Sequence, residues 1–421
     1  MLFASEIGTA KDNLLSPVHN WYKFTAGFSY KLINELVLSE KIGNTNPIFD
    51  PFAGCGTTLV SAQKLGIKAY GNEAQALMYE IISAKLEWSC ERSIVSDILD
   101  KICSSIELFK ARKGKSEGIH PLLITLYEEV DLDDLYYLRN YLLSNIQDNK
   151  YQSFFKLALA QTLHKVSSVP IAAPYIIRGK AKARNDMTVF AIFKSIAINM
   201  CNDLDTLPHL NKTSNVYLQD SREENLSIGI NECDYCITSP PYLNNLDYGE
   251  ISKVHTHFFN ITDDWSDITT KVRKKLVTGS TTHYKKSDFN FVQWKDSMPF
   301  NDNPALGQQL TELHDIIKSV SESKTGRKSF NILMCLYFYD MLAVLKETRR
   351  ILKPNGKAFL VLGDSAPYGE LVPTTEIMGQ LATSVGFEQF KIYKLRDRGS
   401  KWKNLKYRHS VEVAENILKI W

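Results

Sequence analysis

The pattern of hydrophobic and polar residues predicts three successive segments, in which the type of secondary structure changes twice along the chain. Residues 30–40 place Leu32 and Leu36 on one face, a spacing that is typical of an amphipathic helix. The apolar pair Ile48 and Phe49 then indicates a short buried strand, because it is followed by a glycine-containing turn. The first part of the chain is therefore expected to alternate between helices and strands.

Residues 80–210 have a different pattern. They are rich in Leu, Ile, Lys and Glu at three-to-four spacing, which predicts a mostly helical insertion. A basic, proline-containing segment at 168–186 interrupts it. The expected helices are 93–111, 121–146, 151–166 and 187–204.

The alternating pattern resumes after the insertion and predicts an α/β fold. Residues 243–330 are the exception, since they are polar and aromatic without a clear period. A turn at Lys353-Pro-Asn-Gly356 is expected to close a long helix. The expected strands are 215–218, 235–238, 357–363, 387–396 and 409–420, the last two as a hairpin, and the expected helices are 331–352 and 374–385.

Composition limits the classes of function. The 421 residues are 23% charged with a net charge of +3, which is ordinary for a globular protein. No apolar run of about 18 residues and no leader pattern occur, so neither a membrane span nor secretion is expected. The seven scattered cysteines favour reduced thiols in a cytoplasm. Cys233 and Cys236 have no second Cys/His pair nearby, so no metal site is predicted.

Basic residues gather in three short segments, 178–184, 271–275 and 391–409, the last of which also carries aromatic residues. Basic clusters can neutralise phosphates and aromatic rings can stack on bases, which favours nucleic acid as a partner over a merely solvated face. The candidate contacts are Arg178, Lys180, Arg184, Lys271, Arg273, Lys401, Trp402 and Lys403.

The first chemical motif is DPFAGCGTT, residues 50–58. Gly54 and Gly56 let the backbone approach a ligand closely, and the helix expected from Thr57 offers free N–H groups. An acidic Asp50 ahead of the glycines suits a cationic amino-acid group better than a pyrophosphate, and no phosphate-binding loop of the P-loop type occurs. Glu73 ends the next strand, where a carboxylate can accept both hydroxyls of a ribose.

The second motif is Ser239-Pro240-Pro241-Tyr242, directly after an apolar strand. Consecutive prolines fix the backbone and lack N–H groups, so their loop is rigid and its carbonyls are free to accept. Such a loop can present a hydroxyl and a carbonyl to an exocyclic amino group, with the aromatic ring stacked on the base.

DPFAGCGTT followed by TSPPY resembles the motifs of the S-adenosylmethionine-dependent DNA amino-methyltransferases, which modify N6 of adenine or N4 of cytosine. The resemblance covers about 20–80 and 213–420. It implies a Rossmann-like methyltransferase fold, with a mostly parallel sheet, a terminal antiparallel hairpin and a large helical insertion. It also implies S-adenosyl-L-methionine as cofactor, double-stranded DNA as partner, and a restriction-modification or related defence system with its cognate endonuclease.

The resemblance also implies residue roles. Asp50 to Gly56 would hold the methionine end of the cofactor, Glu73 the ribose and Asp220 the adenine amino group. The target base would leave the duplex, with Tyr242 stacked on it. The cofactor set is Phe24, Asp50, Pro51, Phe52, Gly54, Gly56, Thr57, Glu73 and Asp220, and the catalytic set is Ser239, Pro240, Pro241 and Tyr242.

Ser ahead of Pro-Pro is typical of the N4-cytosine group, whereas the adenine group more often has Asp or Asn there. The motif order differs from the permuted order common among N4 enzymes, so N6-adenine stays open as the alternative. An RNA base methyltransferase and a non-catalytic nucleic-acid-binding relative are the further alternatives. The expected division is 1–80 and 213–421 for the methyltransferase domain and 81–212 for the insertion, with DNA recognition in the insertion, in 243–330, or in both.

Overall fold

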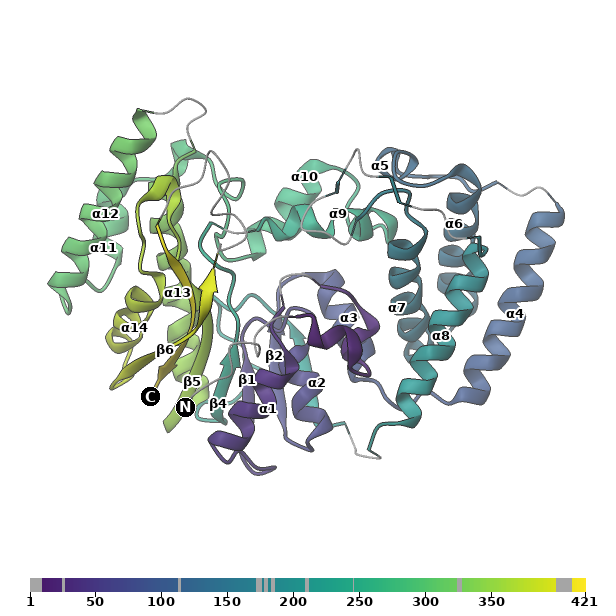
Figure 1. Cartoon of the computed structure of the whole chain (residues 1–421), viewed down its shortest axis with the longest axis horizontal. Helices are drawn as coiled ribbons and strands as arrows, with labels where there is room; N and C mark the ends of the chain where they lie inside the picture. The colour runs from purple at the N-terminus through teal and green to yellow at the C-terminus, as the bar shows by residue number, and fades with distance from the viewer. Residues whose placement is uncertain are drawn as a thin grey trace.

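A computed structural model of the chain shows a central sheet with a lobe of helices on one side and a helical bundle on the other (Figure 1). Within the described residues, no helix is long and apolar enough to cross a membrane. The structure describes residues 10–24, 27–112, 115–171, 176–177, 181–182, 186–208, 212–244, 246–323, 328–398 and 411–421.

One seven-stranded sheet has the order β3-β2-β1-β4-β5-β7-β6. Strands β1 to β5 pair in parallel, and β7 runs antiparallel to both β5 and β6. This topology confirms the expected Rossmann-like methyltransferase sheet with a terminal hairpin. The strands are β1 (Ile48–Asp50), β2 (Ala69–Glu73), β3 (Ser214–Leu218), β4 (Cys233–Thr238), β5 (Leu352–Gly363), β6 (Phe390–Arg398) and β7 (Val413–Ile420).

Helices cover both faces of the sheet, and the alternation of side chains along a strand explains how the sheet serves two cores. Ile48 belongs to the hydrophobic cluster of the N-terminal helices and the bundle, and its neighbour Phe49 to the cluster of the C-terminal helices. The first face carries α1 (Tyr30–Ser39), α2 (Thr57–Lys64) and α3 (Ala76–Leu86), and the second carries α13 (Phe330–Ile351) and α14 (Thr374–Ser384).

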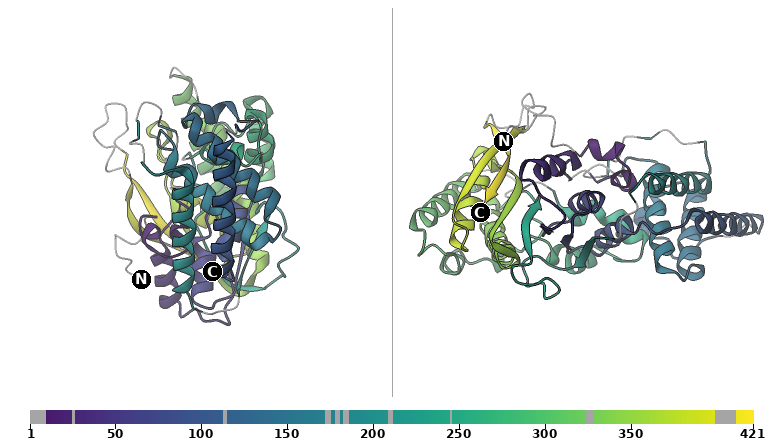
Figure 2. Two further views of the ribbon diagram at one scale, coloured as in Figure 1. Left: turned by 90° about the vertical axis from the view of Figure 1, so that its right-hand side faces the viewer. Right: turned by 90° about the horizontal axis from the view of Figure 1, so that it is seen from below.

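The expected helical insertion forms the bundle, whose long helices run roughly side by side (Figure 2). The single helix expected over 121–146 is wrong, because two helices occupy that range. The chain is extended at Glu128, and Glu129 with Asp131 then provides the acidic first turn that favours a new helix start. The helices are α4 (Arg92–Ala111), α5 (Pro121–Ile124), α6 (Glu129–Asn145), α7 (Asn149–Val166) and α8 (Val189–Asp205).

The turn expected at Lys353–Gly356 is also wrong, because these residues belong to β5. Cys233 of β4 pairs with Leu352, but Tyr235 pairs with Lys357, so β5 has extra residues between these two pairs, and they form a bulge. Pro and Gly suit such a bulge for the same reasons that they suit a turn.

The segment 243–330, without a clear period in its sequence, folds as short helices joined by loops. Its described helices are α9 (Tyr248–Phe258), α10 (Trp265–Asp267), α11 (Phe291–Ser297) and α12 (Pro304–Glu322), with η3 (Ile268–Val272), η4 (Arg273–Lys275) and η5 (Lys286–Asp288) between them. Single turns elsewhere are η1 (Asp12–Leu15), η2 (His19–Trp21) and η6 (Pro367–Gly369).

Candidate active site

A pocket lies at the carboxyl ends of the parallel strands, and its empty space is about 770 Å³ when the open solvent at its mouth is included. The strand order reverses between β1 and β4, and this switch point is where open α/β sheets bind their ligands. Each of the first four strands contributes the residues that directly follow it. From these loops the pocket is lined by Pro51, Phe52, Ala53, Gly54, Cys55, Ala74, Gln75, Gln219, Asp220, Ser221, Ser239 and Pro241.

The glycine turn after β1 has the backbone that its sequence predicts. Gly54 and Gly56 have φ of 59° and 84°, in the left-handed region that favours glycine. A Cβ on Gly56 would also lie 3.2 Å from Ile82 of α3, so this position is tightly packed in addition to having a left-handed backbone conformation. The turn therefore brings the start of α2 against the floor of the pocket.

Glu73 ends β2 and lines the pocket while holding the glycine turn. Its carboxylate accepts the backbone N–H of Gly54 at 2.9 Å and that of Gln75 at 2.8 Å. Burial raises the pKa of Glu73 to about 7, against the opposing effect of these hydrogen bonds. Each oxygen keeps a lone pair, so the carboxylate can still accept from a ligand hydroxyl.

Asp50 connects the glycine motif to the end of β4, just ahead of the loop of residues 239–242. Its Oδ1 accepts the hydroxyl of Thr238 at 2.6 Å and the backbone N–H of Phe52 at 3.0 Å. Burial raises the pKa of Asp50 to about 6, and the side chain is 1% exposed. Asp50 and Gly56 are absent from the pocket lining, so they shape the site from behind its surface.

Three distant elements fix the loop of residues 239–242. Tyr337 of α13 donates to the Pro241 carbonyl at 2.9 Å. Ser365, just after β5, donates to the carbonyl of Leu243 at 3.1 Å. Ser239 and Pro241 line the pocket, whereas Pro240 lies buried behind it.

The C-terminal hairpin holds the last residue of this loop. The Tyr242 hydroxyl donates to Glu415 of β7 at 2.8 Å, and Arg396 of β6 pairs with the same carboxylate at 2.6 Å. The guanidinium of Arg398 lies 4.8 Å from the centre of the Tyr242 ring. A base that stacks on Tyr242 has to use another face of the ring or displace Arg398. The sequence did not indicate these partners, which lie more than 150 positions away along the chain.

Asp220 follows β3 and lines the pocket, but its carboxylate is already clamped by Arg222. The two side chains meet at 3.0 Å (Nε to Oδ1) and 2.6 Å (Nη2 to Oδ2), and the backbone N–H of Arg222 also donates to Oδ1 at 3.0 Å. Three N–H groups occupy a carboxylate that offers about four lone-pair sites. Room for one further donor remains.

Of the other predicted cofactor residues, Phe24 and Thr57 also line the pocket. The sequence missed several lining residues, and Asn72 beside Glu73 is the one that its position could have indicated. The missed residues are Asn72, Ala74, Gln75, Met78, Gln219, Ser221, Tyr248, Lys275, Leu276 and Val277.

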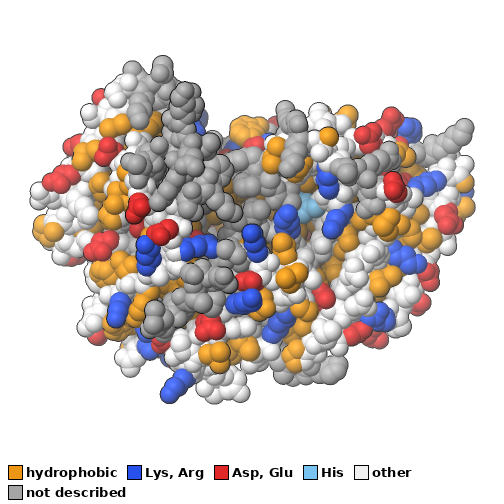
Figure 3. Space-filling model, in the orientation of Figure 1, with side chains coloured by type: hydrophobic (Ala, Val, Ile, Leu, Met, Phe, Trp, Pro, Cys, Tyr) orange, Lys and Arg blue, Asp and Glu red, His pale blue; other side chains and the backbone are white. Residues whose placement is uncertain are grey.

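The prediction that Arg273 contacts nucleic acid is wrong for this fold. Its side chain is 2% exposed and forms an ion pair with Asp247 at 2.8 Å, so it cannot reach a phosphate. Lys271 is exposed and pairs with Asp267 at 2.7 Å. The remaining candidates lie outside the described residues: Arg178, Lys180, Arg184, Lys401, Trp402 and Lys403. In Figure 3 other Lys and Arg side chains lie across the middle of the molecule, between the hairpin side and the bundle.

The chain matches known proteins along nearly its whole length. It is 21% identical to the type II methyltransferase M.BsoBI of Geobacillus stearothermophilus, over 100% of this chain and 88% of that protein. It is 22% identical to M.AvaI of Nostoc sp., over 91% and 82%, and 21% identical to M.MvaI of Kocuria varians, over 92% and 85%. The chain is a homologue of type II methyltransferases. No protein family profile matches it.

Type II methyltransferases take their methyl group from S-adenosyl-L-methionine, and the pocket of their homologue suits that molecule. Two pocket residues, Asn72 and Gln75, have buried polar atoms, Nδ2 and Oε1, without a hydrogen-bond partner among the described residues. Buried polar atoms without partners are costly, so a polar ligand is the natural way to satisfy them. The carboxylates of Glu73 and Asp220 and the apolar Phe24 complete a lining for a cationic nucleoside.

Proposed function

We propose that the protein is a site-specific DNA methyltransferase that transfers a methyl group from S-adenosyl-L-methionine to N4 of cytosine. The observation that carries this proposal is that one pocket is lined both by the glycine motif, with Gly54 and Glu73, and by Ser239 and Pro241. The homology to type II methyltransferases supports a modification enzyme of a restriction-modification system, with a cognate endonuclease as its cellular counterpart. N6 of adenine is the alternative acceptor.

The residues of the pocket suggest how the reaction proceeds. When bound, S-adenosyl-L-methionine supplies an electrophilic methyl group on a sulfonium sulfur. Ser239 Oγ accepts one hydrogen of the exocyclic amino group of a flipped base. The Pro240 carbonyl, from a residue that is buried and does not line the pocket of the free protein, would accept the other once the base is bound, so that the nitrogen lone pair turns toward the methyl carbon. The cofactor would give up this methyl group and keep the electron pair of the broken bond, and the proton that the methylated nitrogen loses would pass to water.

Most of the rate gain comes from positioning and from dipoles aimed at the positive charge that develops on the amino nitrogen. The rigidity of the loop supports this view, because Tyr337, Ser365 and Glu415 each hold one point of it. No covalent adduct with the base is needed. Cys55, which lies in the glycine turn, has no chemical role in this scheme.

The test is incubation with labelled S-adenosyl-L-methionine and mixed-sequence duplex DNA, followed by nucleoside analysis and mapping of the methylated sites. We expect N4-methylcytosine, and Ser239→Ala should lower the rate roughly a hundredfold. Ser227→Ala, at an exposed serine that does not line the pocket, is the matched control and should behave as wild type. N6-methyladenine as the product would overturn the cytosine assignment, and equal activity on RNA would overturn the DNA assignment.

A further inference from the structure

Four lining residues of the pocket come from the segment 243–330 and not from the strand ends. Tyr248 begins α9, and its ring lies nearly parallel to that of Phe24, with 6.3 Å between the ring centres and 28° between the planes. Lys275 ends the single turn η4, and Leu276 and Val277 follow it; all three line the pocket, and we call residues 275–277 the strap. Because Tyr248 is only the first residue of α9 and the strap only follows a single turn, the position of these four residues depends on the contacts around them.

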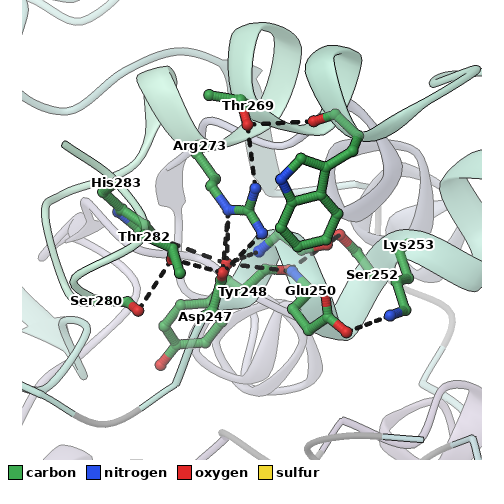
Figure 4. A network of polar contacts seen from close by, with 12 residues as sticks. Asp247, Tyr248, Glu250, Ser252, Lys253, Thr269, Arg273, Ser280, Thr282 and His283 are labelled. Atoms are coloured by element: carbon green, nitrogen blue, oxygen red, sulfur yellow. Dashed lines mark hydrogen bonds and ion pairs between the residues drawn. The ribbon is translucent and has the colours of Figure 1, made fainter. Parts of the chain in front are cut away.

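A buried ion pair connects the start of α9 to the start of the strap (Figure 4). Arg273 Nε donates to both oxygens of Asp247, at 3.2 and 3.0 Å. The same carboxylate caps α9 by accepting the backbone N–H groups of Gly249 at 3.0 Å and Glu250 at 3.2 Å. Thr282, beyond the strap, donates its hydroxyl to it at 2.7 Å. One carboxylate therefore fixes the chain immediately before Tyr248 and on both sides of the strap.

This pair is sealed from solvent, since Asp247 is 5% and Arg273 2% exposed. The Trp265 ring covers the guanidinium at 4.1 Å from its centre. Burial opposes ionisation of Asp247, but hydrogen bonds with His283, Arg273 and Thr282 hold its pKa below the usual range. Separating the two partners would leave an uncompensated buried charge, which is strongly destabilising. The pair therefore holds the residues around it in one arrangement.

A second arginine holds the strap from the opposite side. Arg222 donates to the carbonyl of Lys274 at 2.7 Å, and its other contacts reach Asp220 and, at 3.3 Å, Asp340. Asp340 in turn accepts the backbone N–H and the hydroxyl of Thr278, at 2.8 and 2.7 Å. The residues on either side of the strap are thus tied to Asp220, the side chain at the end of β3.

We propose that Asp247, Arg273 and Arg222 are positioning residues that hold Tyr248 and the strap as the wall against which the adenosine part of the cofactor packs. This inference rests on the proposed function, because it takes S-adenosyl-L-methionine as the ligand. We assign this wall to the adenosine end of the cofactor because Arg222 joins the strap to Asp220. Asp220 lies beside Glu73, whose carboxylate suits a ribose. Part of the segment in which DNA recognition was expected therefore serves the cofactor.

The test measures cofactor binding by calorimetry for the full-length protein and three variants, each first checked for folding by circular dichroism. Leu276→Ala shortens the wall without touching a buried charge and should weaken S-adenosyl-L-methionine roughly tenfold. Arg273→Met should weaken it at least as much. Lys285→Met removes the same charge from an exposed side chain of the same segment and should bind within about twofold of wild type. In competition experiments, Leu276→Ala should weaken the binding of adenosine and leave the binding of methionine unchanged.

Hydrogen exchange supplies a second reading that does not depend on the variants. Peptides that contain residues 274–278 should exchange more slowly when S-adenosyl-L-methionine is added to the wild-type protein. If a folded Leu276→Ala variant binds the cofactor with wild-type affinity, and hydrogen exchange over the strap does not change, the proposed wall is wrong while the proposed function still stands. Failure of the wild-type protein to bind the cofactor would overturn the proposed function and the wall with it.

Discussion

The affinity for S-adenosyl-L-methionine should depend steeply on pH, because two buried carboxylates belong to its site. The pKa of Glu73 is raised to about 7 and that of Asp50 to about 6, in each case chiefly by burial. A carboxylate accepts from ribose hydroxyls and attracts a cation best when it is ionised. At pH 6, a carboxyl with a pKa of about 7 is ionised in roughly one molecule in ten.

We therefore expect the affinity at pH 6 to be about tenfold below its plateau above pH 8. Below pH 6 the slope should become steeper, as Asp50 is protonated as well. Binding near pH 6.5 should release a proton, because the cationic cofactor favours the ionised form of both groups. Calorimetry at pH 5.5 to 8.5, in buffers with different ionisation enthalpies, measures both the affinity and the proton release.

Two variants separate the contributions. Glu73→Gln should bind weakly at every pH and lose the part of the dependence centred near pH 7, leaving the part near pH 6. Glu223→Gln, an exposed glutamate near Asp220 in sequence, should keep the wild-type profile. The reasoning is refuted if the wild-type Kd stays within about twofold from pH 5.5 to 8.5 and no proton is released.

Two further predictions follow from the same geometry. In the cofactor-free protein, the folded state binds more protons than the unfolded state between the ordinary pKa of Glu73, 4.5, and its folded value of about 7. The free energy of unfolding should therefore fall as pH rises through this window, by up to about 3 kcal/mol, and urea titrations at pH 5 and 8 would detect it; equal stability at both would contradict the shift. Tyr242→Phe loses the hydrogen bond to Glu415 and should lower kcat roughly tenfold with an unchanged cofactor Kd; a kcat equal to wild type would remove the positioning role of Glu415.

Much of the fold could be predicted from the sequence because it depends on local periodicity. The apolar runs that became β1 and β4, and the three-to-four spacing of α4, α7 and α8, indicate their own structure. The two errors have a common cause. Pro and Gly in Lys353–Gly356, and the acidic residues in the first turn of α6, are compatible with more than one local structure, and strand pairing or helix packing decides among them.

The basic residues illustrate why the pocket itself was less predictable. Arg273 belongs to a run of cations that a sequence alone places at the surface, yet its partner Asp247 lies 26 residues away and Trp265 covers it. Charge composition reports how many cations a segment has, while burial depends on contacts that no spacing rule encodes. Asp50 and Glu73 were indicated because the ends of parallel strands always meet at one edge of the sheet, whatever the loops do.

This difference separates the two kinds of residue in the site. In the proposed reaction the residues at strand ends provide the chemistry, and their relation to one another follows from the sheet. The residues that set the walls come from loops and from the hairpin, as Leu276 with Arg222 and Glu415 with Tyr242 do. Their contacts, rather than the two motifs, should therefore account for differences in cofactor affinity among homologues that share only 21 to 22% of their residues with this chain. Exchanging the strap between such homologues should transfer the cofactor affinity, whereas exchanging the glycine motif should not.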